Sequence, residues 1–179
     1  MTTQEKIEIY ANYLPYKVKL SAEKIWKGFK TNLVISNNTS SYTNGLHINQ
    51  AIEYDAKLIL HPLSDLAKPI KIDSYNDGKE FTPLEVMLKT QINHNSVKIV
   101  GYDFGKNYAS IKYTFEDEEF IHNFSYSSIT KRFQCLLYDG TKEVGILSQF
   151  ELFKMMYRWH FDLLGLINNG VALDINEIK

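Results

Sequence analysis

The chain contains a single cysteine, Cys135, among its 179 residues. One cysteine cannot form an internal disulfide, which argues against a disulfide-rich secreted scaffold and favours a reducing compartment. No segment approaches the roughly 18 consecutive apolar residues that a membrane-spanning helix needs. The first residues also lack the positive region followed by an apolar run that marks a signal peptide. These absences predict a cytoplasmic protein.

A strong charge of either sign is also missing, since the formal net charge is −1. No global basic field therefore favours nucleic acid. The charge is nevertheless uneven: residues 1–50 carry six lysines against three acids, and residues 101–179 carry eight basic against eleven acidic residues. The 44% hydrophobic content is typical of a globular chain, and the length predicts one domain over residues 1–179.

Recognisable catalytic motifs are absent as well. The sequence contains no P-loop, no dinucleotide-binding glycine pattern and no G-x-S-x-G. Its five histidines have no His, Cys, Asp or Glu neighbour at a compact metal-binding spacing. Cys135 lies in the apolar run RFQCLLY, which favours a buried structural residue over a nucleophile. We therefore predict no enzymatic activity, no catalytic residue, no cofactor and no metal site.

Two helices are predicted in the first half of the chain. The segment TTQEKIEIYANYL has apolar residues at helical spacing, Thr2 or Thr3 as its cap, and Pro15 as its stop. The segment 82–92 begins with a threonine cap and a proline in the first turn, and Glu85 completes a capping-box pattern.

A long C-terminal helix is predicted from Ser148 to about Leu164, with an S-x-x-E capping box at its start and Gly165 at its end. Its apolar surface is wider than the usual amphipathic stripe. One interpretation is a helix packed on a sheet by this broad face. The alternative is that part of the surface docks a partner. The surface comprises Leu152, Phe153, Met156, Tyr157, Trp159, His160, Leu163 and Leu164.

Residues 96–147 predict an antiparallel meander of four strand-like runs separated by turns. Polar residues at 110, 112 and 114 alternate with large apolar ones, so we expect one face of this sheet to meet water. Shorter strands are predicted around 18–20, 58–60 and 171–175, and the apolar run Leu33–Ile35 precedes a polar, turn-rich tract. The resulting fold class is α+β, with a mainly antiparallel β-sheet packed against the N-terminal, middle and long C-terminal helices.

Two segments are candidates for binding a partner. Residues 16–30 interleave lysines with aromatic residues, a combination that contacts phosphates and stacks on bases. An edge strand whose lysines prevent pairing with another strand accounts equally well for the same pattern. The candidate residues here are Lys17, Lys19, Lys24, Trp26, Lys27 and Lys30.

The second candidate is the acidic run between two predicted strands, Glu116, Asp117, Glu118 and Glu119. Its simplest interpretation is a solvated hairpin tip. A divalent-cation loop is an alternative, although the spacing of a calcium loop is absent. A further alternative is a surface that mimics phosphates and meets a basic groove on a partner.

Four stretches of the chain resemble one family. LHPLSDLAKPIKI and GKEFTPLEVML in the middle, YANYLPYKVK near the start and WHFDLLGLINNGVALDIN near the end are similar to segments of small proteins encoded by phages and prophages. The function of this family is unknown, so the resemblance implies no catalytic residues. Residues 96–147 lie outside the resemblance, and residues 17–57 are longer and more polar than the family pattern.

The resemblance implies a small phage protein that binds a host component. We therefore expect a non-enzymatic inhibitor of a host defence nuclease, similar to anti-CRISPR proteins that act on an RNA-guided effector in the host bacterial cytoplasm. Its contacts would be with the effector protein, together with guide RNA. The alternative is a phage accessory or structural protein that self-associates through the C-terminal helix. A nuclease with an unrecognised site is a third hypothesis.

Overall fold

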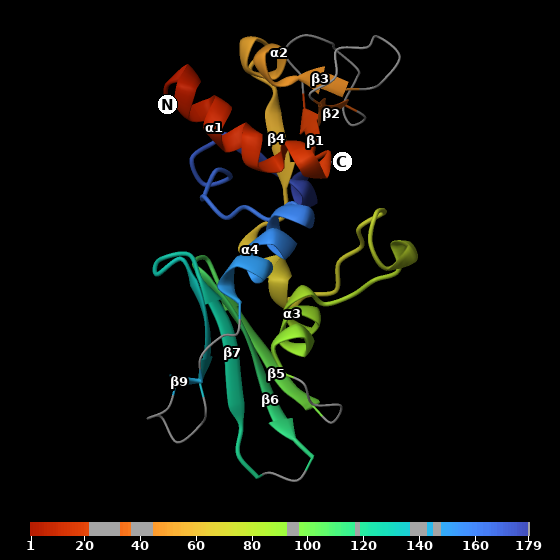
Figure 1. The fold of residues 1–179 in the computed structure, drawn as a ribbon, viewed down its shortest axis with the longest axis vertical. Coiled ribbons are helices and arrows are strands. Elements are labelled where there is room, and N and C mark those ends of the chain that lie inside the picture. Colours follow the sequence, from red (N-terminus) through yellow and green to blue (C-terminus); the bar gives the residue numbers. More distant parts are fainter. Residues whose placement is uncertain are drawn as a thin grey trace. The chain divides into compact units, whose positions relative to one another are not determined.

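The fold is α+β, as the sequence predicts, and it is drawn in Figure 1. The computed structural model describes residues 1–21, 33–36, 45–92, 97–116, 119–136, 143–144 and 148–178. The chain divides into two compact units. Unit 1 comprises Met1–Pro62 and Met156–Lys179, and unit 2 comprises Leu63–Met155. The single-domain organisation over residues 1–179 stays a prediction.

Unit 1 is built on a five-stranded mixed sheet in the order β10-β4-β1-β2-β3. Strand β1 is antiparallel to both β2 and β4, whereas β10 runs parallel to β4 and β3 parallel to β2. The elements are α1 (Thr3–Tyr13), η1 (Leu14–Tyr16), β1 (Lys19–Ser21), β2 (Leu33–Ser36), β3 (Gly45–His47), α2 (Ile48–Glu53), β4 (Lys57–Leu60), β10 (Ala172–Asp174) and η4 (Ile175–Glu177).

The predicted N-terminal helix is present, and Thr2 is its cap. The Thr2 hydroxyl accepts a hydrogen bond from the Glu5 backbone N–H at 3.2 Å, and the Glu5 carboxylate accepts one from the Thr2 N–H at 2.6 Å. This reciprocal pair is a complete capping box, which satisfies two of the N–H groups left open at a helix start. Pro15 follows the helix and lies in the short 3-10 turn η1.

The core of unit 1 lies between helices α1 and α2 and the adjacent strands β1 and β4. It contains Tyr10, Tyr13, Val18, Leu20, Ala51, Ala56, Leu58, Leu60, Leu166 and Ala172. Two of these tyrosines bring a polar group into the core, and both are satisfied. The Tyr10 hydroxyl donates to the Ala56 carbonyl at 2.5 Å, and burial raises its pKa to about 12. The Tyr13 hydroxyl donates to the Phe161 carbonyl at 2.9 Å.

The C-terminal helix is shorter than predicted, because α4 covers Gln149–Arg158 and does not continue to Leu164. His160 has a left-handed φ of 59°, which a continuing right-handed helix does not allow. The next residue, Phe161, forms a parallel bridge with His61 just beyond β4. The His61 N–H donates to the His160 carbonyl at 2.8 Å, and the Asp162 N–H donates to the His61 carbonyl at 2.9 Å. The chain therefore leaves the helix to pair with a strand end.

Unit 2 contains the predicted meander as a second five-stranded sheet. Its strands follow the order β5-β6-β7-β8-β9, and every neighbouring pair is antiparallel. The elements are η2 (Leu63–Ala67), η3 (Asn76–Gly78), α3 (Pro83–Gln91), β5 (Val97–Gly105), β6 (Tyr108–Phe115), β7 (His122–Ser127), β8 (Arg132–Leu136), β9 (Glu143–Val144) and the first turns of α4.

One face of this second sheet is apolar and forms the core of unit 2. Phe124 and Phe133 stack with ring centroids 5.7 Å apart, and Phe153 of α4 meets Phe133 edge-on at 5.7 Å. Gln149, at the start of α4, fixes the helix to β8. Its side-chain amide donates to the Phe133 carbonyl at 2.7 Å and its oxygen accepts from the Phe133 N–H at 2.9 Å.

The middle helix α3 begins at Pro83 as predicted, but the predicted capping box is wrong. Thr82 occupies the cap position without a side-chain hydrogen bond to the helix. The Glu85 carboxylate instead accepts a hydrogen bond from the hydroxyl of Tyr102 on β5. Because Glu85 is engaged with the sheet, its bond ties α3 to the first strand of the meander.

Candidate functional site

The residues of the predicted lysine segment are only partly described. Lys17 and Lys19 lie before and within β1 in unit 1, and both are exposed. Lys17 has a left-handed φ of 53°, at the point where the chain leaves η1. The remaining candidates, Lys24, Trp26, Lys27 and Lys30, lie outside the described residues.

The acidic candidates lie in unit 2, in the connection between β6 and β7. Glu116 and Glu119 are exposed, and Asp117 and Glu118 lie outside the described residues. Phe120 follows directly and is 61% exposed. The two predicted binding segments therefore belong to different units.

The broad apolar surface of the C-terminal segment is used for packing. Leu152, Met156 and Trp159 are fully buried, and Leu163 is nearly so. Phe150, in the first turn of α4, is the large exposed apolar residue of this helix, at 70%. The packing interpretation is favoured for these buried residues, whereas Leu164 is exposed and Phe153, Tyr157 and His160 are half-buried.

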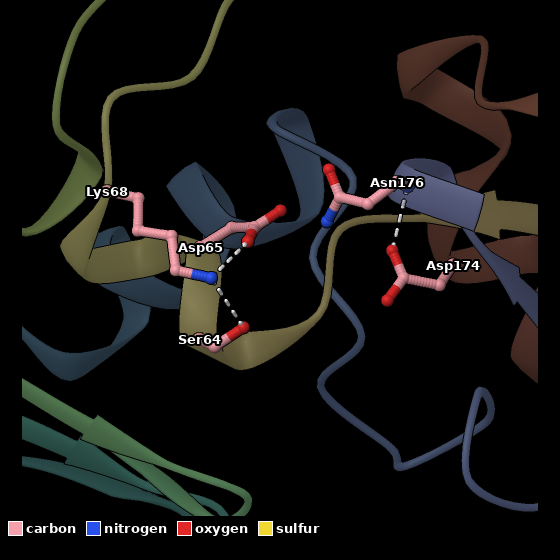
Figure 2. A network of polar contacts seen from close by, with 5 residues as sticks. All are labelled: Ser64, Asp65, Lys68, Asp174 and Asn176. Atoms are coloured by element: carbon pink, nitrogen blue, oxygen red, sulfur yellow. Dashed lines mark hydrogen bonds and ion pairs between the residues drawn. The ribbon is translucent and has the colours of Figure 1, made fainter. Parts of the chain in front are cut away.

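The Leu-Ser-Asp-Leu stretch of the phage-like resemblance forms the 3-10 turn η2. Asp65 is buried, and Figure 2 shows Lys68 reaching back to it. The Lys68 ammonium donates to the Ser64 hydroxyl and to the Asp65 carboxylate, each at 3.4 Å. It also lies 4.8 Å from the centre of the Phe104 ring. These contacts give the motif a structural role within unit 2.

The Trp-His-Phe-Asp stretch is also held by a buried carboxylate. Asp162 accepts hydrogen bonds from the backbone N–H groups of Leu166 at 2.8 Å and Ile167 at 2.9 Å. Burial raises the pKa of this carboxyl, and the backbone hydrogen bonds oppose that rise. Asp162 therefore organises the turn after α4. A smaller cap of the same kind closes the chain, where Asp174 accepts from the Asn176 N–H at 2.9 Å (Figure 2).

His160, within the same turn, is a half-buried histidine of unit 1. Its Nε2 lies 2.8 Å from the Tyr16 carbonyl oxygen. Burial lowers the pKa of His160; the hydrogen bond to Tyr16 opposes this, and the nearby charges of His61 and Lys19 lower the pKa further. A histidine whose pKa is lower in the folded than in the unfolded chain contributes stability above its unfolded pKa of about 6.5. That contribution is lost as the pH falls through the folded value.

We expect the melting temperature of the wild type to fall between pH 7.5 and pH 5 by more than that of His160→Asn. Asparagine tolerates the left-handed backbone and does not titrate, so it removes the proton uptake while keeping the turn. Thermal unfolding followed by circular dichroism at several pH values measures this difference. Parallel pH profiles for the two proteins would assign the acid sensitivity to other groups.

The second sheet has a polar face opposite its apolar one, which we name the open face. Register pairs Lys112 with Asn123, and Ser110 with both Asp103 and Ser125. Directly paired residues lie on the same side of a sheet, so these side chains form one surface. The open face comprises Lys98, Asp103, Tyr108, Ser110, Lys112, Thr114, Asn123, Ser125, Ser127, Arg132 and Gln134.

Cations dominate the open face and one end of its sheet. Lys98, Lys112 and Arg132 lie on the face, and Lys106 and Lys131 lie in the turns at one end. Those two turns are joined, because the Ser128 N–H donates to the Asn107 carbonyl at 2.9 Å. Within the described part of the chain, the four lysines form no hydrogen bond or ion pair.

Asp103 is an acidic residue of the open face that already has a hydrogen-bonding partner. Asp103 accepts a hydrogen bond from the Tyr108 hydroxyl at 3.2 Å, which raises the pKa of the tyrosine. Arg132 is oriented by its neighbour on β8. With the Gln134 amide turned so that its oxygen faces Arg132, this oxygen accepts from the guanidinium Nε at 3.2 Å. The face therefore presents ordered hydrogen-bonding groups between cations.

Within the described ranges, no group of three or more His, Cys, Asp or Glu residues could hold a metal ion. The Cys135 thiol is buried against the Tyr113 hydroxyl, 3.1 Å away, and burial raises its pKa. A protonated, covered thiol is a poor nucleophile.

Comparisons of the chain with protein-family models, with curated proteins and with solved structures find no match. None of the helices in the described segments has the length and apolarity of a membrane span. The function is therefore inferred from the open face and from the resemblance stated above.

Proposed function

We propose that this chain is a non-enzymatic binding protein whose open face binds single-stranded nucleic acid. The observation that carries the proposal is the charge of that surface. Five cations, at positions 98, 106, 112, 131 and 132, stand against two described acids. Tyr108 already engages Asp103, and the register places Glu143 in line with Asn123 through Leu136. Ammonium and guanidinium groups that neutralise phosphates release counterions, and this release drives most non-specific binding.

The shape and chemistry of the open face favour a single strand over a duplex. A sheet surface meets an extended strand along its length, and Tyr108, which is 41% exposed, offers a ring for stacking against a base. The half-buried hydroxyls of Ser125 and Ser127 provide hydrogen-bonding groups between the cations. Hydroxyl groups of this kind bond to phosphate oxygens and to ribose 2′-hydroxyls.

The phage-like resemblance supplies the biological setting of the proposal. In this setting the strand is the guide RNA of a host defence nuclease, and the chain is an inhibitor that binds the RNA-guided effector in the host bacterial cytoplasm. The acidic connection near Glu116 and Glu119 would then meet a basic surface of the effector protein. Self-association through the C-terminal helix has less support, because Leu152, Met156 and Trp159 of its apolar surface are fully buried.

The double variant Lys106→Glu/Lys112→Glu is expected to bind oligouridine at least tenfold more weakly than the wild type at low salt. Two phosphate contacts are lost, so the slope of log affinity against log salt should fall by about 1.4, at about 0.7 per contact on a single strand. Fluorescence anisotropy with labelled oligouridine and oligothymidine, across a range of salt concentrations, measures both quantities.

The matched control is Lys17→Glu/Lys19→Glu, which makes the same charge change on unit 1. We expect this variant to bind within about twofold of the wild type, because neither lysine belongs to the open face. If the control loses affinity and the open-face variant does not, the interface lies on the lysine segment. If the wild type fails to bind either oligonucleotide at low salt, the nucleic-acid proposal is wrong.

A pull-down with the tagged chain from a host with active CRISPR systems tests the setting separately. Recovery of an RNA-guided effector, lost after RNase treatment, is the expected result. Recovery of an effector regardless of RNase would place the contact on protein. Recovery of the chain alone would remove the inhibitor proposal and leave the oligonucleotide result to stand by itself.

A further inference from the structure

Strand β5 forms an edge of the second sheet, because the strand order begins with β5 and β6 is its neighbour. It is nine residues long and carries three exposed apolar side chains. Val100 is 51%, Tyr102 43% and Phe104 44% exposed. An edge strand presents a row of backbone groups that are ready to pair with another strand. A long edge bearing exposed apolar residues is therefore a candidate interface.

A β-bulge in β5 changes which side chains share a face. Ile99 pairs with Tyr113, but Gly101 pairs with Lys112, so Val100 is an extra residue in the strand. Without the bulge, residues 98 and 103 would lie on opposite faces, because they are an odd number of positions apart. With it, both Lys98 and Asp103 lie on the open face, opposite Thr114 and Ser110 of β6.

This arrangement makes the edge complementary to itself. When two copies of β5 run antiparallel about a two-fold axis between Val100 and Gly101, Lys98 of each copy faces Asp103 of the other. On the apolar side, Ile99 then faces Tyr102 of the second copy. Val97 and Phe104 form the outer pair in the same way. Each of these three pairs combines side chains that stabilise a sheet, opposite charges or an aliphatic residue with an aromatic one, and at the centre Val100 of one copy faces Gly101 of the other.

The backbone groups match in the same register. Along an antiparallel pair, residues alternate between those that exchange hydrogen bonds and those that do not. Lys98 and Asp103 pair with Thr114 and Ser110, which are an even number of positions apart on β6, so both belong to one class. Ile99 and Tyr102 pair with Tyr113 and Ile111 and share the other class. Groups of equal orientation therefore meet across the two-fold axis.

We propose that β5 is a homodimerisation strand, which joins the second sheets of two copies edge to edge in this register. The partner is a second copy of this chain, and the Lys98–Asp103 pairs set its orientation. This inference goes beyond the proposed nucleic-acid binding. The two open faces would lie on the same side of the joined sheet, so a dimer would offer one strand the cations at positions 106, 112, 131 and 132 of both copies, while Lys98 is paired with Asp103.

A charge-swap experiment tests the register. Lys98→Asp and Asp103→Lys each place like charges opposite one another at both ends of the interface. Each variant alone should therefore dimerise at least about tenfold more weakly than the wild type, since opposed like charges destabilise a pair. Mixing the two variants restores opposite charges at both positions, and the mixture should form heterodimers with affinity close to that of the wild type.

Sedimentation velocity of nuclease-treated full chain, over a wide concentration range, measures these affinities without a nucleic-acid ligand. Circular dichroism confirms that each variant is folded. The inference is overturned if the wild type stays monomeric at all concentrations, in which case Lys98 prevents β5 from pairing with another strand. It is also overturned if the single variants dimerise like the wild type, or if mixing them restores nothing. None of these outcomes depends on whether the open face binds nucleic acid.

Discussion

Replacing Trp159 with alanine is expected to lower the free energy of unfolding by about 3–5 kcal/mol, the range typical of large-to-small changes in a core. Trp159 follows the last residue of α4 and has 0% of its surface exposed. The substitution removes most of the largest fully buried side chain in the described part of the chain and leaves a cavity. Since a domain is stable by only about 5–15 kcal/mol, the variant should be close to unfolding at growth temperature.

The matched control for this prediction is Phe150→Ala, at the other end of the same helix. Phe150 is 70% exposed, so its truncation should change stability by no more than about 0.5 kcal/mol. Urea unfolding followed by circular dichroism compares the two variants with the wild type. Similar midpoints for Trp159→Ala and the wild type would mean that the segment after α4 does not pack as described.

The Asp162→Ala variant is expected to lose about 2–5 kcal/mol of stability, although the side chain is small. Its carboxylate accepts hydrogen bonds from the Leu166 and Ile167 N–H groups, and each buried donor left without a partner costs about 1–3 kcal/mol. The cost should be larger than that of removing an ordinary surface acid, because water cannot easily replace the carboxylate in this turn.

Asp174→Ala provides the comparison for Asp162, since Asp174 accepts from a single N–H group, that of Asn176, in an exposed turn. Loss of a cap of this kind costs about 1 kcal/mol. Differential scanning calorimetry of both variants should show a clearly larger fall in melting temperature for Asp162→Ala. Equal falls would contradict a special role for the buried carboxylate. Asp162→Asn, which keeps one acceptor oxygen, should lie between the wild type and Asp162→Ala.

Local signals in the sequence were sufficient for several elements of the fold. The capping box at Thr2 and the proline at 83 place α1 and α3 correctly, because helix starts depend on residues within one turn. Alternation at residues 110–114 predicts a wet face of β6, and the burial pattern of that strand agrees at Lys112, which is exposed, and Thr114, which is half-buried, but not at Ser110, which is buried. These features are decided by neighbours in the chain, which a sequence displays directly.

Features that depend on distant partners were not predictable in the same way. The apolar pattern continues past Arg158 because the following turn is also buried, so periodicity alone extends the helix too far. Glu85 fits a capping box by spacing, yet it bonds to Tyr102 on another element. Two separate sheets form where the sequence predicted one. In the sheet of unit 1, β4 pairs in parallel with β10, a strand from the end of the chain.

The candidate site shows the same limit. The lysines of residues 16–30 form the denser cluster in the sequence, whereas the open face draws its cations from β5, β6, β8 and two turns. Strict alternation also assigns Lys98 and Asp103 to opposite faces, and only the bulge at Val100 brings them together. The alternating polar residues of β6, β7 and β8 were the available signal for the open face.

The pairing of β10 with β4 also has a consequence for how the protein is made. Leu58 and Ala172 are neighbours in the sheet of unit 1, although they are 114 positions apart in the chain. A ribosome therefore releases β4 long before its partner exists. Unit 2, whose residues 63–155 are continuous, can complete its fold during translation. Unit 1 has to wait for the last strand, and until then the edge of β4 is the part of the nascent chain that a chaperone would have to protect.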